Sequence, residues 1–443
     1  MAIPVFEVEF DKNGNVVDPQ QVTKALDGIA AAQAGDLLVL SHGWNNDMAD
    51  ARQLYAAILA RIEAQLPAAG QGRTFAALEI FWPSKKFTDT ELIPGGAAAL
   101  GDGDLDPAVL ISRLEALKSE PQRLGVEEVV PERAAALTQA QALVPNLDND
   151  LDAQRQFVEI LRAQLPKDDA DPDDGSDGFF EKDPVELLQS LSEPVPPPPL
   201  PAGGGGAAML EGGGEGGLEG GAAGLGDFFS GAKAGAGRLL NFFTYYQMKK
   251  RAGLVGRTGA ASVLRQIHGR LPQLKLHLIG HSFGGRLVTA AADALGPAVP
   301  VTTLTLLQAA YSHNGLGQKY DGTHDGFFRQ IVTQKKIAGP LLITHTKNDK
   351  AVGIAYPLAS RLSGDVASAL GDANDPYGGM GRNGAQKTPE VDAAVAFLDR
   401  VGTQYRFKVG KIYNLNADEF IKGHSDIAKD EVAFALLTAV ALT

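Results

Sequence analysis

With 443 residues, of which 44% are hydrophobic, the chain is long enough for one large α/β domain that carries an insertion, or for two domains. Its formal net charge of −13, from 40 basic and 53 acidic residues, argues against a general nucleic-acid-binding protein, because no excess of Lys and Arg is present to neutralise phosphates. The chain contains no cysteine, which excludes disulfides, thiolate metal sites and a cysteine nucleophile.

The first part of the chain predicts alternating strands and helices. Residues 5–10 alternate as an entry strand, residues 20–34 have a helical pattern, and residues 37–40 and 75–82 are apolar runs typical of strands in a parallel sheet. The amino-terminal sequence lacks the basic start, apolar run and cleavage site of a signal peptide, and no apolar stretch reaches transmembrane length. We therefore expect a soluble protein of the cytoplasm, with export by a signal-independent route as the alternative.

A glycine-containing loop of sequence SHGWNN, residues 41–46, directly follows the strand at residues 37–40. In a hydrolase built on a parallel sheet, a loop at this place supplies a backbone N–H that points at the reacting carbonyl. The alternative is an ordinary strand-to-helix loop, in which Asn46 or Asp47 caps an amphipathic helix that runs to about Leu66. The serine turn described below favours the first interpretation.

An interruption of this alternation extends from about residue 84 to residue 237. Its first part contains three stretches with helical patterns, at residues 107–117, 132–143 and 151–165. These stretches are expected to pack together as a small helical cap.

The second part of the interruption has a biased composition. Residues 167–177 are densely acidic, but they lack the full ligand order of a calcium loop with its final glutamate, so we favour a solvated charged loop. Residues 194–201 are rich in proline and residues 203–226 are rich in glycine, so we expect this part to be flexible and partly disordered.

Aromatic residues gather in residues 227–251, next to the basic run Lys249, Lys250 and Arg251. One interpretation is a mobile apolar lid that meets lipid or an apolar substrate. The other is a buried helix that re-enters the core. We favour the buried helix, because aromatic stripes on helices usually pack inside.

The sequence LKLHLIGHSFGG, residues 274–285, predicts the chemistry of the protein. A buried strand leads into the motif GHSFG and then into a helix of small residues. This order is typical of a nucleophile elbow, in which the serine, here Ser282, lies on a tight turn with its hydroxyl above the sheet. The two glycines of the motif remove side chains that would collide with the strand and the helix. The flanking strand and helix favour a nucleophile over a serine that merely lies in a tight turn.

Further elements follow the elbow. Residues 301–308, 341–346 and 405–414 predict three more strands. Residues 371–387, rich in Gly, Asn and Asp, are expected to form a surface loop, and residues 428–442 a closing helix.

A serine hydroxyl becomes nucleophilic when a histidine takes its proton, and that histidine needs an acid to orient it. The chain order serine, acid, histidine selects His424, which alone among the histidines follows the last strand in a loop. We favour Asp349 as the acid, because it lies just past the end of the strand at residues 341–346. Asp321 or Asp325, after the preceding strand, is the alternative.

The loop between the strands predicted at residues 301–308 and 341–346 carries four side chains of metal-ligating type, His313, Asp321, His324 and Asp325. No ligand spacing fixed on a helix supports a metal site there, so we expect none.

With these residues placed, the chain resembles the α/β-hydrolase superfamily, and within it bacterial serine hydrolases of poorly described function. The matching segments are His42-Gly43-Trp44-Asn45, Trp82-Pro83-Ser84, Gly280-His281-Ser282-Phe283-Gly284, Asn348-Asp349 and His424-Ser425-Asp426. The resemblance implies an oxyanion hole made by the backbone N–H groups of Phe283 and Trp44, with Gly43 as an alternative donor. It implies no metal and no organic cofactor.

The resemblance covers residues 1–84 and 238–443, which are expected to form an α/β-hydrolase core, a mostly parallel sheet flanked by helices. Residues 85–237 have no counterpart in it. They are expected to form a long, helical and partly disordered insertion that acts as a cap or lid.

These residues predict an esterase-like or lipase-like carboxylic-ester hydrolase. Ser282 would form an acyl-enzyme, which water activated by His424 would clear. The aromatic residues near Phe242 favour a small-molecule or lipid ester over a peptide, while thioesters and amides stay open. One alternative is an exported lipase or phospholipase effector that attacks a membrane surface. Another is a hydrolase-like scaffold that binds partners through its insertion and catalyses nothing.

Overall fold

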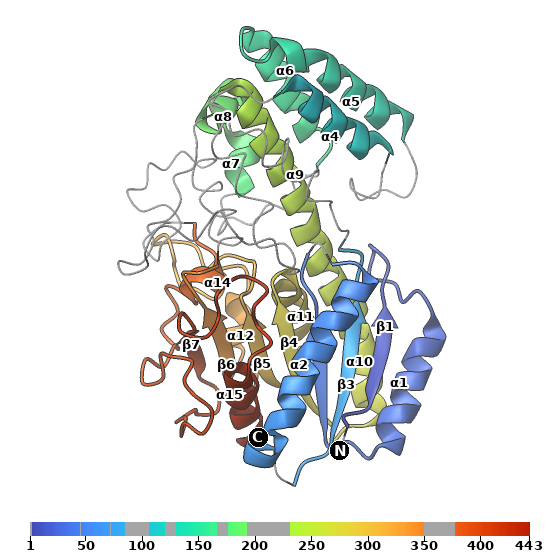
Figure 1. Cartoon of the computed structure of the whole chain (residues 1–443), viewed down its shortest axis with the longest axis vertical. Helices are drawn as coiled ribbons and strands as arrows, with labels where there is room; N and C mark the ends of the chain where they lie inside the picture. The colour runs from blue at the N-terminus through green and yellow to red at the C-terminus, as the bar shows by residue number, and fades with distance from the viewer. Residues whose placement is uncertain are drawn as a thin grey trace, which may run out of the picture.

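The computed structural model gives the arrangement of most of the chain (Figure 1). The described residues are 2–44, 46–70, 72–84, 106–119, 130–165, 176–192, 231–349 and 377–443, without the side chains of residues 241 and 244. The proline-rich and glycine-rich segments and most of the acidic run lie outside the described residues.

In the part of the chain that the structure describes, seven strands form one central sheet, in the order β1-β3-β2-β4-β5-β6-β7. The strands are β1 (Val5–Glu9), β2 (Asp36–Ser41), β3 (Phe75–Phe81), β4 (Lys275–His281), β5 (Val301–Leu307), β6 (Leu341–His345) and β7 (Ile412–Asn416). Neighbouring strands are parallel throughout the described sheet, where a mostly parallel one was expected. All the strands therefore end at the same edge, and the fold belongs to the α/β class.

Helices cover both faces of this sheet (Figure 1). One face carries α1 (Pro19–Ala31), α10 (Ala261–Arg270), α11 (Phe283–Leu295) and α12 (Arg329–Thr333), and the other carries α2 (Met48–Ala69) and α15 (Asp430–Ala441). The three layers follow the order helix, sheet, helix.

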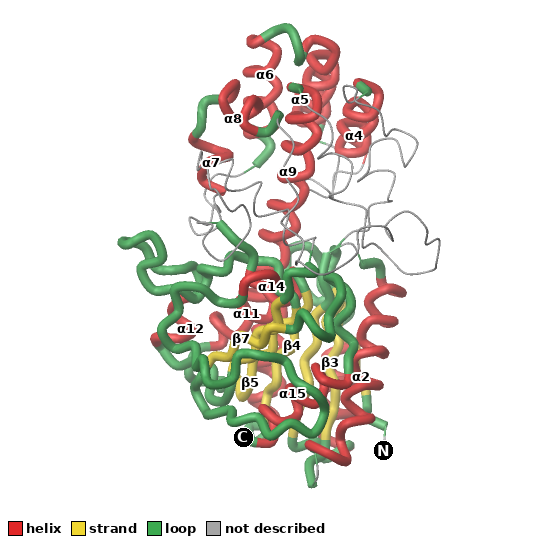
Figure 2. The backbone as a smooth tube through the Cα atoms, turned by 60° about the vertical axis from the view of Figure 1, so that its left-hand side comes forward, coloured by secondary structure: helices red, strands yellow, loops and turns green. Residues whose placement is uncertain are grey.

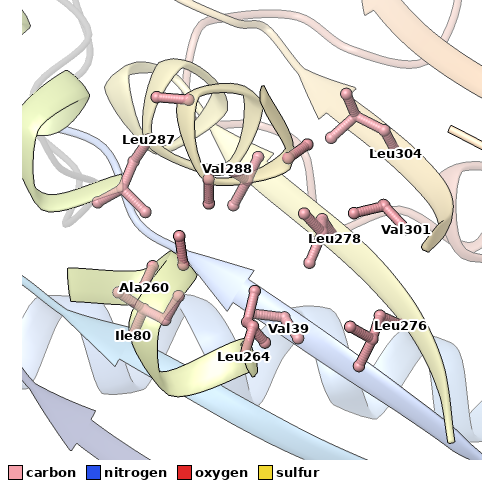
Figure 3. Packing of buried hydrophobic residues seen from close by; sticks show 14 of the residues in the cluster. Val39, Ile80, Ala260, Leu264, Leu276, Leu278, Leu287, Val288, Val301 and Leu304 are labelled. Atoms are coloured by element: carbon pink, nitrogen blue, oxygen red, sulfur yellow. The ribbon is translucent and has the colours of Figure 1, made fainter. Parts of the chain in front are cut away.

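Strand β2 explains why both layers are needed. Leu37 and Val39 belong to the core beneath α1, α10 and α11, whereas Leu38 and Leu40 belong to the core beneath α2 and α15. Successive side chains of a strand point to opposite faces, so a continuous apolar run is buried only between two layers. Figure 3 shows part of the first core, where side chains of β2, β4 and β5 meet those of α10 and α11.

A second group of helices lies above the carboxyl edge of the sheet and has a hydrophobic core of its own (Figures 1 and 2). It contains α4 (Pro107–Ser119), α5 (Pro131–Leu143), the short 3₁₀ helix η3 (Val144–Asn146), α6 (Leu151–Arg162), α7 (Ser176–Glu181) and α8 (Pro184–Ser190). The three helices predicted for the insertion correspond to α4, α5 and α6. Among the described helices, none is both long enough and apolar enough to cross a membrane.

The long helix α9 (Ala232–Leu254) connects the two cores. Its buried apolar residues from Ala232 to Tyr246 pack among the upper helices, whereas the partly buried Tyr245 and the buried Met248 and Ala252 pack in the core of the sheet. A π-helical turn, η6 (Val255–Ala260), then joins α9 to α10. The boundary between the two hydrophobic cores therefore lies within α9, several residues after residue 237, where the insertion was expected to end.

The aromatic side chains of α9 are packed inside. Phe242 is 4% exposed and Phe243 and Tyr246 are still less so, and the Phe242 ring lies 5.4 Å from that of Phe179. The buried-helix interpretation is thus confirmed for this part of the segment. The neighbouring residues 227–230 lie outside the described part of the chain.

The last strand was predicted too early. Strand β7 is Ile412–Asn416, whereas residues 405–411 are not a strand. Gly410 has a φ of 71°, a left-handed conformation that interrupts an extended strand. Tyr405 and Phe407 instead stack on each other at 4.7 Å and pack with the core beneath α2 and α15.

The prediction of a surface loop at residues 371–387 was wrong for its second half. Residues 377 onwards are described, and they contain the short helix α14 (Met380–Asn383), in which Met380 is fully buried. The backbone N–H groups of Met380 and Gly381 donate to the carbonyl oxygens of Tyr311 and Ala309. These bonds hold the segment against the end of β5, which a glycine-rich composition does not reveal.

We predict that truncation of Leu278, a fully buried residue of β4 shown in Figure 3, strongly destabilises the sheet. Leu278→Ala should lower the free energy of unfolding by about 2–5 kcal/mol, because it removes buried methyl groups and leaves a cavity. Leu151→Ala is the matched control, since Leu151 is 57% exposed, and should change it by less than about 0.5 kcal/mol. Urea unfolding measures both, and equal losses would contradict the assignment of the core.

Candidate active site

The order of the strands defines where a site is expected. After β2 the chain continues to β3 on one side, and after β4 it continues to β5 on the other, while β2 and β4 are neighbours. In open parallel sheets such a switch point leaves a crevice at the carboxyl ends of the two strands, and ligands bind there. The loop after β2 begins at His42, and Ser282 follows β4 directly. The two predicted motifs therefore meet at this switch point.

Ser282 has a strained backbone, with φ 56° and ψ −125°. Few residues other than glycine adopt a positive φ, and those that do are held there by their surroundings. The N–H of Ser282 donates to the carbonyl of Leu307 at 3.1 Å, and its carbonyl accepts from the N–H of Ala310 at 3.0 Å. A methyl group on Gly280 would lie 2.4 Å from the carbonyl oxygen of Gly284, so glycine is required for this turn. The strand-turn-helix predicted from the sequence is thus present.

The loop after β2 makes a close contact with the serine. A Cβ on Gly43 would lie 2.6 Å from Ser282 Cβ and 3.1 Å from Ser282 Oγ. Only a glycine therefore fits at this position without displacing the serine. Trp44 follows on the same loop, and its ring lies 6.1 Å from that of Phe283. The first turn of α11 leaves the N–H of Phe283 without a carbonyl partner inside its own helix.

His42 holds this loop in place. Its ring stacks on Trp82 at 5.5 Å, and the Trp82 Nε1–H donates to the His42 carbonyl at 3.0 Å. The backbone N–H of Trp82 points at His42 Nε2 at 3.3 Å, so the proton of the neutral ring is on Nδ1, which donates to the Gly43 carbonyl at 2.9 Å. The backbone N–H of His42 in turn donates to the Tyr55 hydroxyl at 2.7 Å. Burial lowers the pKa of His42 to about 4.

The other end of the loop is also fixed. The Ser84 hydroxyl donates to the Asn46 carbonyl at 2.9 Å, and the Asn46 amide donates to the Trp44 carbonyl at 3.1 Å. Asp47, the residue after it, is the cap of α2 and makes a capping box with Asp50. The motifs SHGWNN and Trp82-Pro83-Ser84 therefore form one structural unit, and the capping residue is Asp47, one of the two candidates.

His424 and Asp349 lie together. Nδ1 of His424 is 2.8 Å from Oδ2 of Asp349, whose side chain is fully buried. Because a carboxylate accepts, this contact places a proton on Nδ1, so Nε2 is the nitrogen of the neutral ring that can accept one. The favoured acid is thus the one that contacts the histidine.

The loops that carry these two residues are joined by Asp418. Its Oδ1 accepts from the Thr346 hydroxyl at 2.8 Å and from the Lys347 N–H at 2.9 Å. Burial opposes ionisation, but these hydrogen bonds hold the pKa of Asp418 below its ordinary value. The Asn348 amide donates to the carbonyl of Ile421 at 2.9 Å. Hydrogen bonds therefore join the loop after β6 to the loop after β7. Asp418 was not among the residues singled out from the sequence.

The two alternative acids, Asp321 and Asp325, contact residues other than His424. Asp321 pairs with His324 at 2.7 Å on the surface, where the hydrogen bond from His324 holds the pKa of Asp321 below its usual range. Asp325 accepts from the backbone N–H of Lys319 at 2.9 Å. His313 is buried and contacts the N–H of Gly378 at 3.2 Å. Asp321 and His324 form a pair, but no cluster of three or more metal-ligating side chains occurs among the described residues.

The serine is joined to the loop of His424 through its neighbour His281, whose Nε2 lies 2.9 Å from the His424 carbonyl oxygen. The residue before the serine, His281, lies with its ring 4.9 Å from that of His424. Among the described residues, the hydroxyl of Ser282 makes no hydrogen bond to the imidazole of His424. The structure therefore has the acid–histidine contact formed and the histidine–serine contact open.

Some of these partners carry signals in the sequence. Asp418 follows β7 as Asp349 follows β6, so both lie at the carboxyl edge of the sheet. The contact between His42 and Trp82 leaves no local pattern, because the two residues are brought together only by the pairing of β2 and β3.

Comparison of the chain with protein-family models, with curated proteins and with solved structures found no match.

We predict that His42 makes the folded protein sensitive to mild acid. The pKa of His42 is about 4 when folded and 6.5 in a free chain. As the pH falls below 6.5, the unfolded chain binds a proton at His42 that the folded protein does not bind. The free energy of unfolding should therefore fall by about 1 kcal/mol per pH unit between pH 6 and pH 5.

His42→Gln should remove this contribution. The variant should be less stable at pH 7, since it loses the stacking on Trp82, but its stability should fall less steeply between pH 6 and pH 5. Urea unfolding followed by tryptophan fluorescence is suited to the test, since the two tryptophans, Trp44 and Trp82, lie in this unit. Equal slopes for variant and parent would contradict the prediction.

Proposed function

We propose that the protein is a serine hydrolase of the α/β-hydrolase type, which cleaves carboxylic esters through an acyl-enzyme on Ser282. The proposal is carried by the 2.8 Å contact between His424 Nδ1 and the buried Asp349, at the sheet edge where Ser282 occupies its strained turn. Serine hydrolases use such an arrangement to activate a hydroxyl. The position of the serine after β4, the middle strand of the parallel sheet, supports the same architecture.

In the first half of the proposed reaction, the Ser282 oxygen attacks the ester carbonyl while His424 Nε2 takes the hydroxyl proton. The negative charge that develops on the carbonyl oxygen is stabilised by the backbone N–H groups of Phe283 and Trp44, or of Gly43 in place of Trp44. The amino-terminal end of α11 adds its partial positive charge. His424 then gives the proton to the leaving alcohol as the ester C–O bond breaks, and the acyl group stays on the serine.

In the second half, His424 takes a proton from water, and the resulting hydroxide attacks the acyl carbonyl. The bond between the acyl group and Ser282 breaks, the serine recovers its proton from His424, and the carboxylic acid leaves. Asp349 holds the imidazole in one tautomer and stabilises its positive charge throughout. Because the serine and the histidine are not yet hydrogen-bonded, the cycle requires this contact to close, as it does in many enzymes when substrate binds.

Aromatic side chains at the serine turn support an apolar acyl group as substrate. The buried ring of Phe283 lies 5.0 Å from Tyr245 of α9 and 6.1 Å from Trp44. Tyr245 and Trp44 are half-buried. Phe242, which the sequence pointed to, is part of the core of the upper helices. The preference for apolar esters therefore rests on the rings around Phe283.

We expect a fluorophosphonate probe to label the folded protein at Ser282. An activated serine attacks the phosphorus atom of the probe as it would attack the carbonyl carbon of an ester. Ser282→Ala should abolish both the labelling and the hydrolysis of p-nitrophenyl esters graded by chain length. Mass spectrometry of the labelled peptide identifies the site. Failure of the folded parent protein to react would overturn the proposal and favour the non-catalytic scaffold.

The two candidate acids give opposite expectations. Asp349→Asn should lower kcat by about 10³- to 10⁴-fold, because the amide no longer holds the histidine in the required tautomer. Asp321→Asn is the matched control, since its carboxylate lies on the surface beside His324, and kcat should stay within about twofold of the parent. Steady-state kinetics on a p-nitrophenyl ester, with circular dichroism to verify folding, decides between them. The reverse ranking would move the acid to the earlier loop.

A further inference from the structure

His281 is a buried imidazole beside the serine for which the proposed mechanism has no use. It is the last residue of β4, directly before Ser282, and it is 4% exposed. Its Nε2 lies 2.9 Å from the backbone carbonyl oxygen of His424. The side chain therefore joins the middle strand of the sheet to the loop that carries the histidine.

The partners of the ring determine its protonation. A carbonyl oxygen only accepts, so Nε2 of His281 carries the proton and donates it to His424. The other nitrogen, Nδ1, is buried and has no hydrogen-bond partner among the described residues. A methyl group on Gly43 would lie 3.3 Å from this atom. Burial, and then the neighbouring His424, lower the pKa of His281 to about 3, so the ring stays neutral.

We propose that His281 is a positioning residue that fixes the backbone of His424 relative to Ser282. This inference rests on the proposed function, since it assigns His281 a role in the same reaction. Asp349 holds the ring of His424 through Nδ1, and His281 holds its main chain through the carbonyl oxygen. Two anchors, one in the loop after β6 and the other at the end of β4, thereby define where Nε2 of His424 lies.

The neutral state of His281 serves the same purpose. The ionisable groups that face it are His424 from the loop after β7 and His42 from the loop after β2, with Asp349 behind His424. A positive charge on His281 would disfavour the protonated form of His424, which the reaction has to pass through. A neutral N–H donor positions the histidine without that effect.

The test compares two substitutions at this position. His281→Gln keeps an N–H donor at about the distance of Nε2, whereas His281→Leu keeps the bulk and removes the donor. We expect His281→Leu to lower kcat for a p-nitrophenyl ester by about 10- to 100-fold with little change in KM, since it displaces a reacting group. His281→Gln should restore most of the loss and keep the pH dependence of kcat/KM of the parent.

His277→Gln is the matched control, because His277 lies on the same strand and is buried against Asp36, away from the serine turn. It should lower stability and leave kcat unchanged. Activity of His281→Leu equal to that of the parent, or of His281→Gln equal to that of His281→Leu, would overturn the inference.

Hydrogen exchange separates this inference from the proposed function. The peptide that contains His424 should exchange faster in His281→Leu than in the parent, and His281→Gln should restore slow exchange. Unchanged exchange in His281→Leu would overturn the positioning role even in an active enzyme. A parent protein that is inert towards fluorophosphonate would overturn the proposed function, while exchange would still decide whether His281 holds the loop.

Discussion

The close approach of the loop after β2 to the turn after β4 is the constraint on which the site depends. Ser282 adopts its strained backbone because the ends of β5 and α11 hold it there, and Gly43 leaves room for its side chain. Any side chain at residue 43 would displace the serine. The parallel pairing of β2 with β4 thus brings Ser282 and the loop of Gly43 into contact although more than 200 residues separate them in the chain.

Electrostatics at this sheet edge follow from burial. His42 and His281 are both kept neutral by the loss of solvent, and each uses one nitrogen to hold a piece of backbone. Of the three histidines at this edge, His42, His281 and His424, the last is the one that contacts a carboxylate, that of Asp349.

Local patterns predicted much of this structure. The apolar runs gave β1 to β6, and the strand, GHSFG motif and helix gave the turn at Ser282, because each is encoded by neighbouring residues. The positions of Asp349 after β6 and of His424 after the last strand favoured this pair. Position alone left Asp321 and Asp325 open, and the contact between His424 and Asp349 is seen only in the structure. The Asp418 contacts and the stacking of His42 on Trp82 were not predictable, since they arise between loops that only the sheet makes neighbours. Likewise, the positive φ of Gly410 interrupts the extended run that was expected before β7. The burial of Met380 depends on hydrogen bonds between its segment and the residues that follow β5.

The upper helices lie over the same edge of the sheet (Figure 1). Helix α9 places the ring of Tyr245 5.0 Å from that of Phe283. If Ser282 and His424 act as one acyl-transfer unit, a crystal structure of the protein after reaction with diethyl p-nitrophenyl phosphate should reveal it. We expect a phosphorus–oxygen bond to Ser282, a phosphoryl oxygen within about 3 Å of the Phe283 N–H, and His424 Nε2 within hydrogen-bond distance of the serine oxygen. Phosphorylation of another residue, or an imidazole that stays away from the modified serine, would contradict it.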